Sequence, residues 1–360
     1  MRIVKAETIA LSIPFSDGGG AGAGLMPSKW DRLEITLVRL ETDDGFVGWG
    51  EAFAYSCRTA VLAALNDMVF PLVIGAEVED VAGFTGCLQR KLHIQGRFGV
   101  VLFAISGVDI ALWDLAAKRK RLRLADLLGA KRERFPAYAS LVRYGDPAMV
   151  EARARMAADQ GYGAVKLHEI TLPNIEAGRR GASDTKLMTD VNCNWSEDET
   201  RKLLPEMKAL GLHWVEEPIW PPDDTDRLAA LGREFGVPLA SGENAGTAQP
   251  FARIVEAVNF PQPSVTKVGG VSEYLKVADL ARAAQRDVMP HCPYFGPGYW
   301  ASAHLMAAGE GGMFEFLHIE ADAWLSPSIP LPDGGEIALP TGEGLGFEPD
   351  MAVIERFRAD

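Results

Sequence analysis

The chain has 360 residues, a formal net charge of −13 and a hydrophobic fraction of 48%. This length suits one barrel with an accessory domain, and the apolar fraction is sufficient for a large packed core. The acidic balance argues against nucleic acid and anionic membranes as partners, because both require a basic surface.

The cysteines and the N-terminus predict the compartment. The four cysteines are scattered without CxxC spacing: Cys57, Cys87, Cys193 and Cys292. This pattern argues against a zinc ribbon or a disulfide framework and favours a reducing compartment. Lys5 and Glu7 interrupt the region where a secretion signal needs an unbroken apolar run, and no run is long enough to span a bilayer. We therefore expect a cytoplasmic protein.

The first third of the chain is predicted to be an α+β domain over residues 1–130. Residues 1–56 alternate as strands, with a hairpin turn at the DDG of 43–45, and residues 58–126 have helical patterns. Strands followed by helices indicate an accessory domain separate from the rest of the chain.

A glycine-rich segment, residues 16–30, separates the first two predicted strands and carries Met26 and Trp30 near its end. A flexible connector fits this composition. A mobile lid whose apolar tip covers an active site fits it as well. On the second interpretation Met26 and Trp30 are candidate substrate contacts.

From residue 131 to 322 the pattern changes to alternating strands and helices. Eight strands are predicted, at 135–141, 164–168, 186–192, 213–218, 238–244, 263–267, 287–292 and 313–318. Among the intervening helices, one opens with Ser196 and Glu199, which form a capping-box signature, and another covers 271–284. The tail, 323–360, contains no further strand–helix unit and is predicted to fold back on the accessory domain.

The strand ends carry one ionisable residue per repeat, at spacings of 24 to 27 residues. These residues are Lys166, Asp190, Glu216, Glu243, Lys267, His291 and Glu315. Because the C-terminal strand ends of a (β/α) barrel meet at one mouth, we expect these side chains to surround one pocket.

Three of these residues, Asp190, Glu216 and Glu243, are acidic and end consecutive strands. Convergent carboxylates repel one another unless a cation neutralises them, and a ligand set of oxygen alone favours Mg²⁺ over zinc. Successive strand residues face opposite sides, so only one residue of Glu216 and Glu217 is expected to point inward. We choose Glu216.

Lys166 and His168 are two positions apart and therefore share one face of the second strand. Lys166 can orient or polarise a carboxylate. His168 can accept a proton near neutral pH, and neighbouring cations would keep it in the neutral, basic form.

His291 ends the seventh predicted strand, across the barrel from the second. Groups on opposite faces of a substrate allow one to remove a proton while the other delivers one. Glu315 can hydrogen-bond a substrate carboxylate if it is protonated or acts through water, and a structural role fits it nearly as well. The candidate catalytic residues are therefore Lys166, His168, His291 and Glu315.

The order of the short motifs resembles the enolase superfamily, specifically the mandelate racemase/muconate lactonising enzyme family. These motifs are DDGFVGWGEA, DIALWDLAAK, KLH, DVN, EEP, GEN, KVGG and GLG. The resemblance implies an α/β fold, a modified (β/α)₇β TIM-type barrel with a capping domain built from both termini. It also implies Mg²⁺ on the three acids, abstraction of an α-proton from a carboxylate substrate, and a homo-oligomer. Asn192 of DVN and Lys267 of KVGG are supporting candidates.

Two positions depart from the family pattern. His168 replaces the second lysine of the usual Lys-x-Lys motif, which keeps a base but lowers its basicity. Ser264 occupies the sixth-strand position that holds Asp in racemase-like members and Lys in cycloisomerase-like members. Serine can orient His291 by a hydrogen bond, but it adds no negative charge.

These residues favour Mg²⁺-dependent dehydration of a small sugar acid or other hydroxy acid through a metal-stabilised enediolate. In that reaction His168 removes the α-proton and His291 protonates the departing β-hydroxyl. Racemisation or epimerisation, with the two histidines as opposed bases, is the alternative. Cycloisomerisation is disfavoured because the sixth-strand lysine is missing, and a non-catalytic binding protein is disfavoured by the intact acidic triad.

Overall fold

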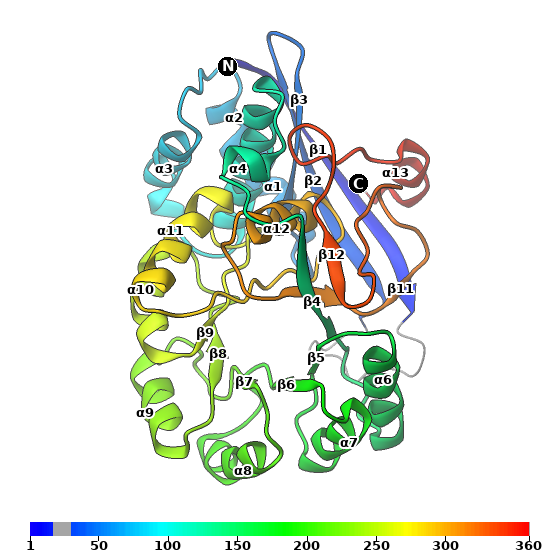
Figure 1. Cartoon of the computed structure of the whole chain (residues 1–360). Helices are drawn as coiled ribbons and strands as arrows, with labels where there is room; N and C mark the ends of the chain where they lie inside the picture. Colours follow the sequence, from blue (N-terminus) through cyan, green and yellow to red (C-terminus); the bar gives the residue numbers. More distant parts are fainter. Residues whose placement is uncertain (17–29, 360) are drawn as a thin grey trace.

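The computed structural model describes residues 1–16 and 30–359 (Figure 1). The expected lid therefore lies outside the described residues except for Ser16 and Trp30, and Met26 lies outside them as well. The described chain forms an α+β cap and an α/β barrel, which in Figure 1 lie one above the other.

The cap contains a four-stranded sheet in the order β11–β1–β2–β3. Its antiparallel strands are β1 (Ile3–Ser16), β2 (Arg32–Thr42) and β3 (Val47–Phe53), with the short β11 (Glu320–Ala321) added at the edge. The turn between β2 and β3 is the predicted hairpin, and Gly45 supplies its positive φ of 85°.

Helices follow these strands, as the sequence predicts. They are α1 (Arg58–Ala63), the π-helix η1 (Ala64–Val69), α2 (Phe70–Val73), α3 (Val81–Lys91), the 3₁₀ turn η2 (His93–Gln95), α4 (Val100–Arg119) and α5 (Leu124–Leu127). The long helix α4 packs very closely on β3. A Cβ atom at Gly50 would lie only 1.9 Å from the Gly107 carbonyl oxygen, so glycine is required at position 50.

Helix α4 has the length and apolar composition to cross a membrane, and among the described residues it alone does. Its most apolar 18-residue window is 78% buried inside the fold. Burial of this kind is typical of the core helix of a folded domain.

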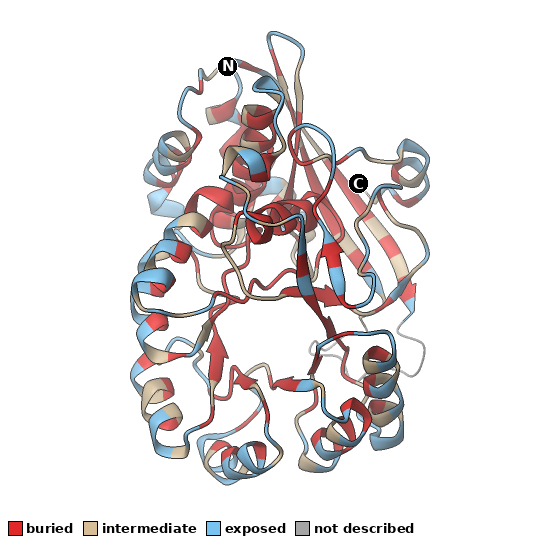
Figure 2. Ribbon diagram, in the orientation of Figure 1, coloured by how far each residue is buried: buried red, intermediate tan, exposed pale blue. Residues whose placement is uncertain are grey.

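The barrel strands are parallel and lie in the order β10–β4–β5–β6–β7–β8–β9. They are β4 (Arg134–Ser140), β5 (Ala164–Leu167), β6 (Lys186–Asp190), β7 (Trp214–Glu216), β8 (Leu239–Ser241), β9 (Phe260–Pro261) and β10 (Phe314–Leu317). The helices are α6 (Pro147–Asp159), α7 (Leu172–Ala182), α8 (Glu197–Ala209), α9 (Thr225–Phe235), α10 (Ala248–Ala257), α11 (Gly270–Ala283) and α12 (Pro297–Ala307). Figure 2 shows that the strands are buried, while the helices turn exposed faces outward.

Two predicted strands are displaced or absent, whereas those predicted at 186–192, 213–218 and 238–244 are present but end two or three residues early. The sixth lies at Phe260–Pro261, before the predicted range of 263–267, and residues 265–269 form a turn. No strand is assigned over 287–292, although the Met289 N–H donates to the Pro261 carbonyl at 3.0 Å and runs beside β9 there. Proline explains both differences, because Pro263 and Pro290 have no N–H to donate to a strand ladder.

Local signals in the helices were predicted correctly. Ser196 caps α8, accepting from the N–H of Glu199, while the Glu199 side chain accepts from the N–H of Ser196. Helix α11 covers most of 271–284, and Val271 and Ala278 are buried on its inner face.

The tail contacts both parts of the molecule. Helix α13 (Met351–Phe357) packs on β1, and the Ala359 N–H donates to the Ala10 carbonyl at 2.9 Å. Strand β12 (Glu336–Ala338) instead pairs antiparallel with β4 of the barrel. The domain limits at residues 130 and 322 remain predictions.

Asp114 on α4 joins the cap strands to the tail. Its buried carboxylate accepts the N–H groups of Trp49 at 2.9 Å and Leu345 at 2.8 Å, and pairs with Lys118 at 2.8 Å. A buried carboxylate with three donors holds strand, helix and tail in one arrangement.

His304 on α12 makes a second connection of this kind. Its Nδ1 accepts the Ala125 N–H at 3.0 Å, so Nε2 carries the hydrogen that is donated to the Leu345 carbonyl, also at 3.0 Å. Burial lowers the pKa of His304 to about 4.

The lowered pKa predicts a pH-dependent stability. In the unfolded chain the His304 ring is protonated below its ordinary pKa, whereas in the folded chain it is protonated only below about pH 4. The neutral ring therefore contributes fully to the stability of the fold at a pH above the ordinary pKa. This contribution is lost as the pH falls toward 4. We expect wild type to lose about 2 kcal/mol more unfolding free energy between pH 7 and pH 5 than His304→Gln, which cannot titrate. Urea unfolding at the two pH values measures this difference, and equal losses would contradict it.

Candidate active site

The strand ends and the cap enclose a cavity of about 880 Å³. The barrel contributes charged and polar side chains, among them His168, Glu243, Lys267, His291 and Glu315. The cap contributes a largely apolar wall that includes Trp30, Leu33, Ile35, Phe53 and Tyr55. Of the seven strand-end residues predicted to surround one pocket, Glu243, Lys267, His291 and Glu315 line this cavity, whereas Lys166, Asp190 and Glu216 are fully buried and are not among its lining residues.

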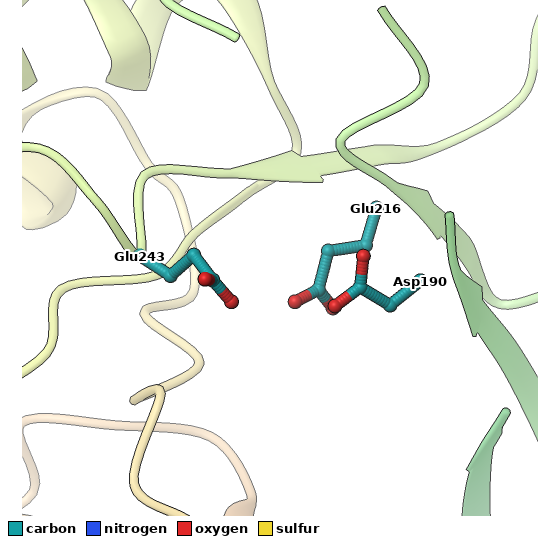
Figure 3. Close-up of side chains that lie close together, drawn as sticks. All are labelled: Asp190, Glu216 and Glu243. Atoms are coloured by element: carbon teal, nitrogen blue, oxygen red, sulfur yellow. The ribbon is translucent and has the colours of Figure 1, made fainter. Parts of the chain in front are cut away.

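Asp190, Glu216 and Glu243 form a buried cluster, in which one carboxylate oxygen from each lies within 4.8 Å of the others. Asp190 and Glu216 end neighbouring strands in register, and Glu243 follows β8 by two residues. Figure 3 shows Asp190 and Glu216 approaching from one side and Glu243 from the other.

Two neighbours orient these carboxylates. Asn192 donates its backbone N–H to one Asp190 oxygen and its side-chain amide to the other, both at 2.8 Å. Trp214 donates its indole N–H to Glu216 Oε2 at 3.0 Å. Asn192 was predicted as a supporting residue. Trp214 was not predicted, because a tryptophan two residues before Glu216 on an apolar strand has the pattern of an ordinary core residue.

Lys166 lies fully buried beneath the cluster. Its Nζ is 3.1 Å from Glu216 Oε1, 2.8 Å from Glu315 Oε1 and 3.9 Å from Asp190 Oδ2. Burial alone would lower the pKa of Lys166, but the surrounding carboxylates outweigh it and raise that pKa well above the ordinary value. Lys166 is therefore a fixed positive charge.

Glu315 is held as an acceptor. It receives hydrogen bonds from Ser140 Oγ at 2.8 Å and from the Cys292 N–H at 3.0 Å, in addition to its pair with Lys166. Burial would raise the pKa of Glu315, but Lys166 and its other partners lower it to about 2. The expectation that a protonated Glu315 donates to a substrate carboxylate does not fit these contacts.

His168 lines the cavity, and its ring hydrogen can be placed from its hydrogen-bond partner. Its Nδ1 lies 2.6 Å from the Leu141 carbonyl oxygen, which can only accept, so Nδ1 carries the hydrogen. In the neutral ring Nε2 is then unprotonated, and it lies 3.5 Å from Asp190 Oδ2. This arrangement is suitable for a general base.

His291 lies on the other side of the acidic cluster, with Nε2 3.2 Å from Glu243 Oε2. Its Nδ1 is 3.2 Å from Tyr294 Oη, and Tyr294 Oη is in turn hydrogen-bonded to Ser264 Oγ. The expected direct hydrogen bond from Ser264 to His291 is not formed, because the tyrosine hydroxyl stands between them. Burial lowers the pKa of His291 to about 4, although Glu243 opposes the shift.

Both glutamates of the EEP motif reach the site, so the expectation that only one points inward was wrong. Glu216 ends β7, and Glu217 has a positive φ of 43°, which breaks the strand alternation. Glu217 lines the cavity.

Lys267 and Trp30 also line the cavity. Lys267 donates to Asn244 Oδ1 at 3.0 Å and lies over the Phe53 ring, 4.4 Å from its centroid. Trp30 packs against Phe15 and Tyr55, with ring centroids 5.2 and 5.1 Å away.

The donor set fits Mg²⁺. It consists of hard carboxylate oxygens, which Mg²⁺ prefers. Burial and the proximity of Asp190 raise the pKa of Glu216 well above its ordinary value despite Lys166, so the crowded carboxylates require more positive charge than the lysine supplies.

Fold and site together define a carboxylate-ligated barrel enzyme, and two family models identify it further. Residues 29–129 match the mandelate racemase/muconate lactonizing enzyme N-terminal domain, and residues 148–353 match the enolase C-terminal domain-like model. The chain therefore belongs to the mandelate racemase/muconate lactonizing enzyme family of the enolase superfamily. It is an enzyme with Mg²⁺ as cofactor, and its predicted fold is confirmed.

Individual relatives carry different activities. The chain is 28% identical over 342 residues to arabinonate dehydratase of Saccharolobus solfataricus, covering 91% of each chain. It is 31% identical to D-galactarolactone cycloisomerase of Agrobacterium fabrum, covering 92% of this chain and 93% of the other. Its fold matches a racemase from Streptomyces coelicolor with bound magnesium at a TM-score of 0.88 and 26% identity, over 99% and 100% of the two chains.

Mg²⁺ binding should depend on each acid of the cluster. At a concentration 100-fold above its dissociation constant, Mg²⁺ should stabilise wild type by about 3 kcal/mol. Glu243→Gln removes one anionic ligand, and its Mg²⁺-induced stabilisation should fall below about 1 kcal/mol. Thermal unfolding with and without Mg²⁺, together with calorimetric titration, measures both.

Asp223→Asn is the matched control, because Asp223 lines the same cavity but is not part of the cluster. It should retain the full Mg²⁺-induced shift. Equal shifts in wild type and Glu243→Gln would show that Mg²⁺ binds elsewhere.

Proposed function

We propose that the enzyme dehydrates a small sugar acid or related hydroxy acid, with Asp190, Glu216 and Glu243 as ligands of Mg²⁺. The observation that carries the proposal is the placement of two histidines on the two sides of the acidic cluster. His168 Nε2 contacts Asp190 and His291 Nε2 contacts Glu243, so each can reach a substrate carboxylic acid held between them.

His168 removes the α-proton in this mechanism. Its Nδ1 hydrogen is committed to the Leu141 carbonyl, which leaves the Nε2 lone pair as the base. Bound Mg²⁺ supplies stabilisation for the negative charge that develops on the substrate carboxylate. Lys166, fixed among the carboxylates, adds positive charge beneath the same region.

His291 then donates a proton to the departing β-hydroxyl. The bond between the β-carbon and oxygen breaks with both electrons on oxygen, and the oxygen leaves as water. The remaining enol converts to a 2-keto-3-deoxy acid. Afterwards His168 releases its proton to solvent and His291 regains one from solvent.

Racemisation or epimerisation is the second candidate, since two histidines flanking one site could serve as opposed bases. That reaction needs His291 as an effective base, and its hydroxyl partner Tyr294 provides no negative charge to stabilise the protonated ring. The sugar-acid dehydratases among the relatives also favour elimination.

The dehydratase proposal is tested by proton NMR in D₂O with a panel of sugar acids and hydroxy acids. Wild type with Mg²⁺ should form a 2-keto-3-deoxy product, and EDTA should abolish it. His168→Ala should lower the rate by about 10² to 10⁴, because it removes the base, and should also abolish exchange of the α-proton.

His93→Ala is the matched control, because His93 is exposed and lies on η2 outside the cavity. It should leave product formation unchanged. Exchange of the α-proton by wild type without elimination would instead establish the racemase or epimerase alternative.

The apolar wall of the cap favours a substrate that carries no charge at the end remote from its reacting carboxylate. Leu33, Ile35 and Phe53 line this side, together with the carboxylate of Glu34. Glu34 is paired with Arg58 at 3.2 Å. A second substrate carboxylate would meet an apolar surface and a like charge there.

We therefore expect kcat/KM for a six-carbon monocarboxylic sugar acid to exceed that for the matching dicarboxylic acid by about tenfold or more. Glu34→Gln removes the like charge and releases Arg58, so it should lower the ratio of kcat/KM for the monocarboxylic acid to kcat/KM for the dicarboxylic acid. Steady-state kinetics with both acids measure it, and an unchanged ratio in the variant would contradict the assignment of Glu34.

The wider organisation is proposed on the same basis. We propose a capping domain over 1–130, a barrel over 131–322, and a C-terminal segment over 323–360 that packs on the cap.

The four cysteines are all among the described residues and are free thiols, which supports a reducing cytoplasmic location. The family resemblance supports a homo-oligomer, and the charge of −13 argues against nucleic acid.

A further inference from the structure

The active-site cavity is larger than a six-carbon sugar acid. Its volume is about 880 Å³. A water molecule in the liquid occupies about 30 Å³, so the roughly 13 non-hydrogen atoms of such an acid would fill less than half of the cavity even at that loose packing. Two linked six-carbon units, with roughly 24 non-hydrogen atoms, would fill most of it. The cavity therefore has room for a second group beyond the acid that reacts.

The mouth of the cavity has an aromatic rim. Phe98 of the cap and Trp220 of the barrel both line the cavity, yet 64% and 71% of their surface is exposed. Large apolar side chains that are exposed singly are ordinary, but two that border one cavity from the cap and the barrel mark a binding surface. Pro221 and Pro222 extend this surface beside Trp220.

Both aromatic side chains are held close to the acidic cluster. Trp220 follows Glu216 by four residues, so their Cα atoms are at most about 14 Å apart. Phe98 packs against Gly246, three residues after Glu243, where an added Cβ atom would lie 3.0 Å from Phe98 Cδ1. A group attached to the far end of a bound sugar acid is therefore within reach of this rim.

Polar side chains at the same rim indicate the chemistry of that group. The Asp223 carboxylate is an acceptor and the Arg253 guanidinium is a donor, and both are exposed and line the cavity. Their charges are opposite, so a phosphate or a second carboxylate would meet no surplus of positive charge there. Hydroxyl groups both donate and accept, and therefore match both side chains.

We propose that the enzyme dehydrates a glycosyl-substituted sugar acid, in which a second, uncharged sugar ring lies on Trp220 and Phe98. A sugar ring has a face of C–H groups, which packs on an aromatic ring, and an edge of hydroxyl groups, which bond polar side chains. The inference rests on the proposed dehydration and names its substrate class more closely.

The reaction determines where the second ring is attached. In the proposed dehydration the α-carbon loses a proton and its hydroxyl oxygen becomes the keto oxygen, while the β-carbon loses its hydroxyl as water. Both hydroxyls must therefore be unsubstituted, so the ring is carried on O4 or an oxygen beyond it. The glycosidic bond stays intact, and the product is a 2-keto-3-deoxy acid that still carries the ring.

Matched pairs of acids test the proposal. Each pair consists of a free sugar acid of the NMR panel and the same acid with a glucosyl or galactosyl group on O4 or O6. For at least one pair, wild type with Mg²⁺ should have a kcat/KM about tenfold higher for the glycosyl acid, because burying about 60 Å² of apolar ring surface corresponds to roughly tenfold in affinity. Equal or lower values for every glycosyl acid would overturn the proposal.

Variants of the rim locate the second ring. Trp220→Ala should lower kcat/KM for the glycosyl acid by about tenfold, mainly through KM, and should change that for the free acid by less than about twofold. Adding Phe98→Ala should bring the two acids close to equal. Both side chains are largely exposed, so the substitutions remove little core packing. An equal loss with both acids would contradict the assignment and show that Trp220 only supports the loop after Glu216.

Ile94→Ala is the matched control. Ile94 is an apolar residue of η2 that is 82% exposed, lies four residues before Phe98 and does not line the cavity. Its substitution should leave kcat/KM for both acids unchanged.

A benzyl ether distinguishes a sugar ring from an apolar group. The benzyl group, placed on the same oxygen of the acid, offers ring contact without hydroxyls for Asp223 and Arg253. Its kcat/KM should fall below that of the glycosyl acid. A higher value for the benzyl ether would show that the rim takes an apolar group and would overturn the proposal of a second sugar.

Failure of the proposed function gives a different result. In that case wild type dehydrates neither the free nor the glycosyl member of any pair. If wild type dehydrates free acids without preferring a glycosyl acid, the dehydratase function stands and only the second ring is overturned.

Discussion

Crowding of three carboxylates in one buried volume is the constraint on which the site depends. Parallel strands in register place Asp190 beside Glu216, and the loop after β8 brings Glu243 against them. Like charges at this separation and burial are strongly unfavourable unless cations compensate. Lys166 compensates part of this negative charge. The negative charge that it leaves uncompensated is the physical reason for a divalent cation at the cluster.

The two histidines differ because their second ring nitrogens have different partners. His168 donates its Nδ1 hydrogen to a backbone carbonyl, which leaves the lone pair of the neutral ring on Nε2. His291 meets the hydroxyl of Tyr294, which can donate to it. The two histidines thus have different hydrogen-bond partners, and such partners commonly direct histidine chemistry.

The cap completes the cavity and is tied to the barrel by buried polar contacts. Glu51 on β3 accepts the N–H of Gly298 at 2.8 Å, at the start of α12. Burial raises the pKa of Glu51 to about 7, which means that keeping this carboxylate ionised inside the fold costs free energy. Asp114 and His304 connect the same elements to the tail, and these links hold the apolar wall of the cap over the polar barrel mouth.

The sequence by itself determined the repeat, the acidic cluster and the family, because spacing along the chain directly sets which residue ends each strand. It also fixed local features such as the α8 capping box, whose partners are three residues apart. Tertiary structure alone decided the partners of those residues. Tyr294 stands between Ser264 and His291, and Glu217 turns into the cavity, through loop geometry that periodicity does not encode. Hydrogen-bond partners are atoms brought together from distant segments, so the partners of the two histidines became visible only in the folded chain.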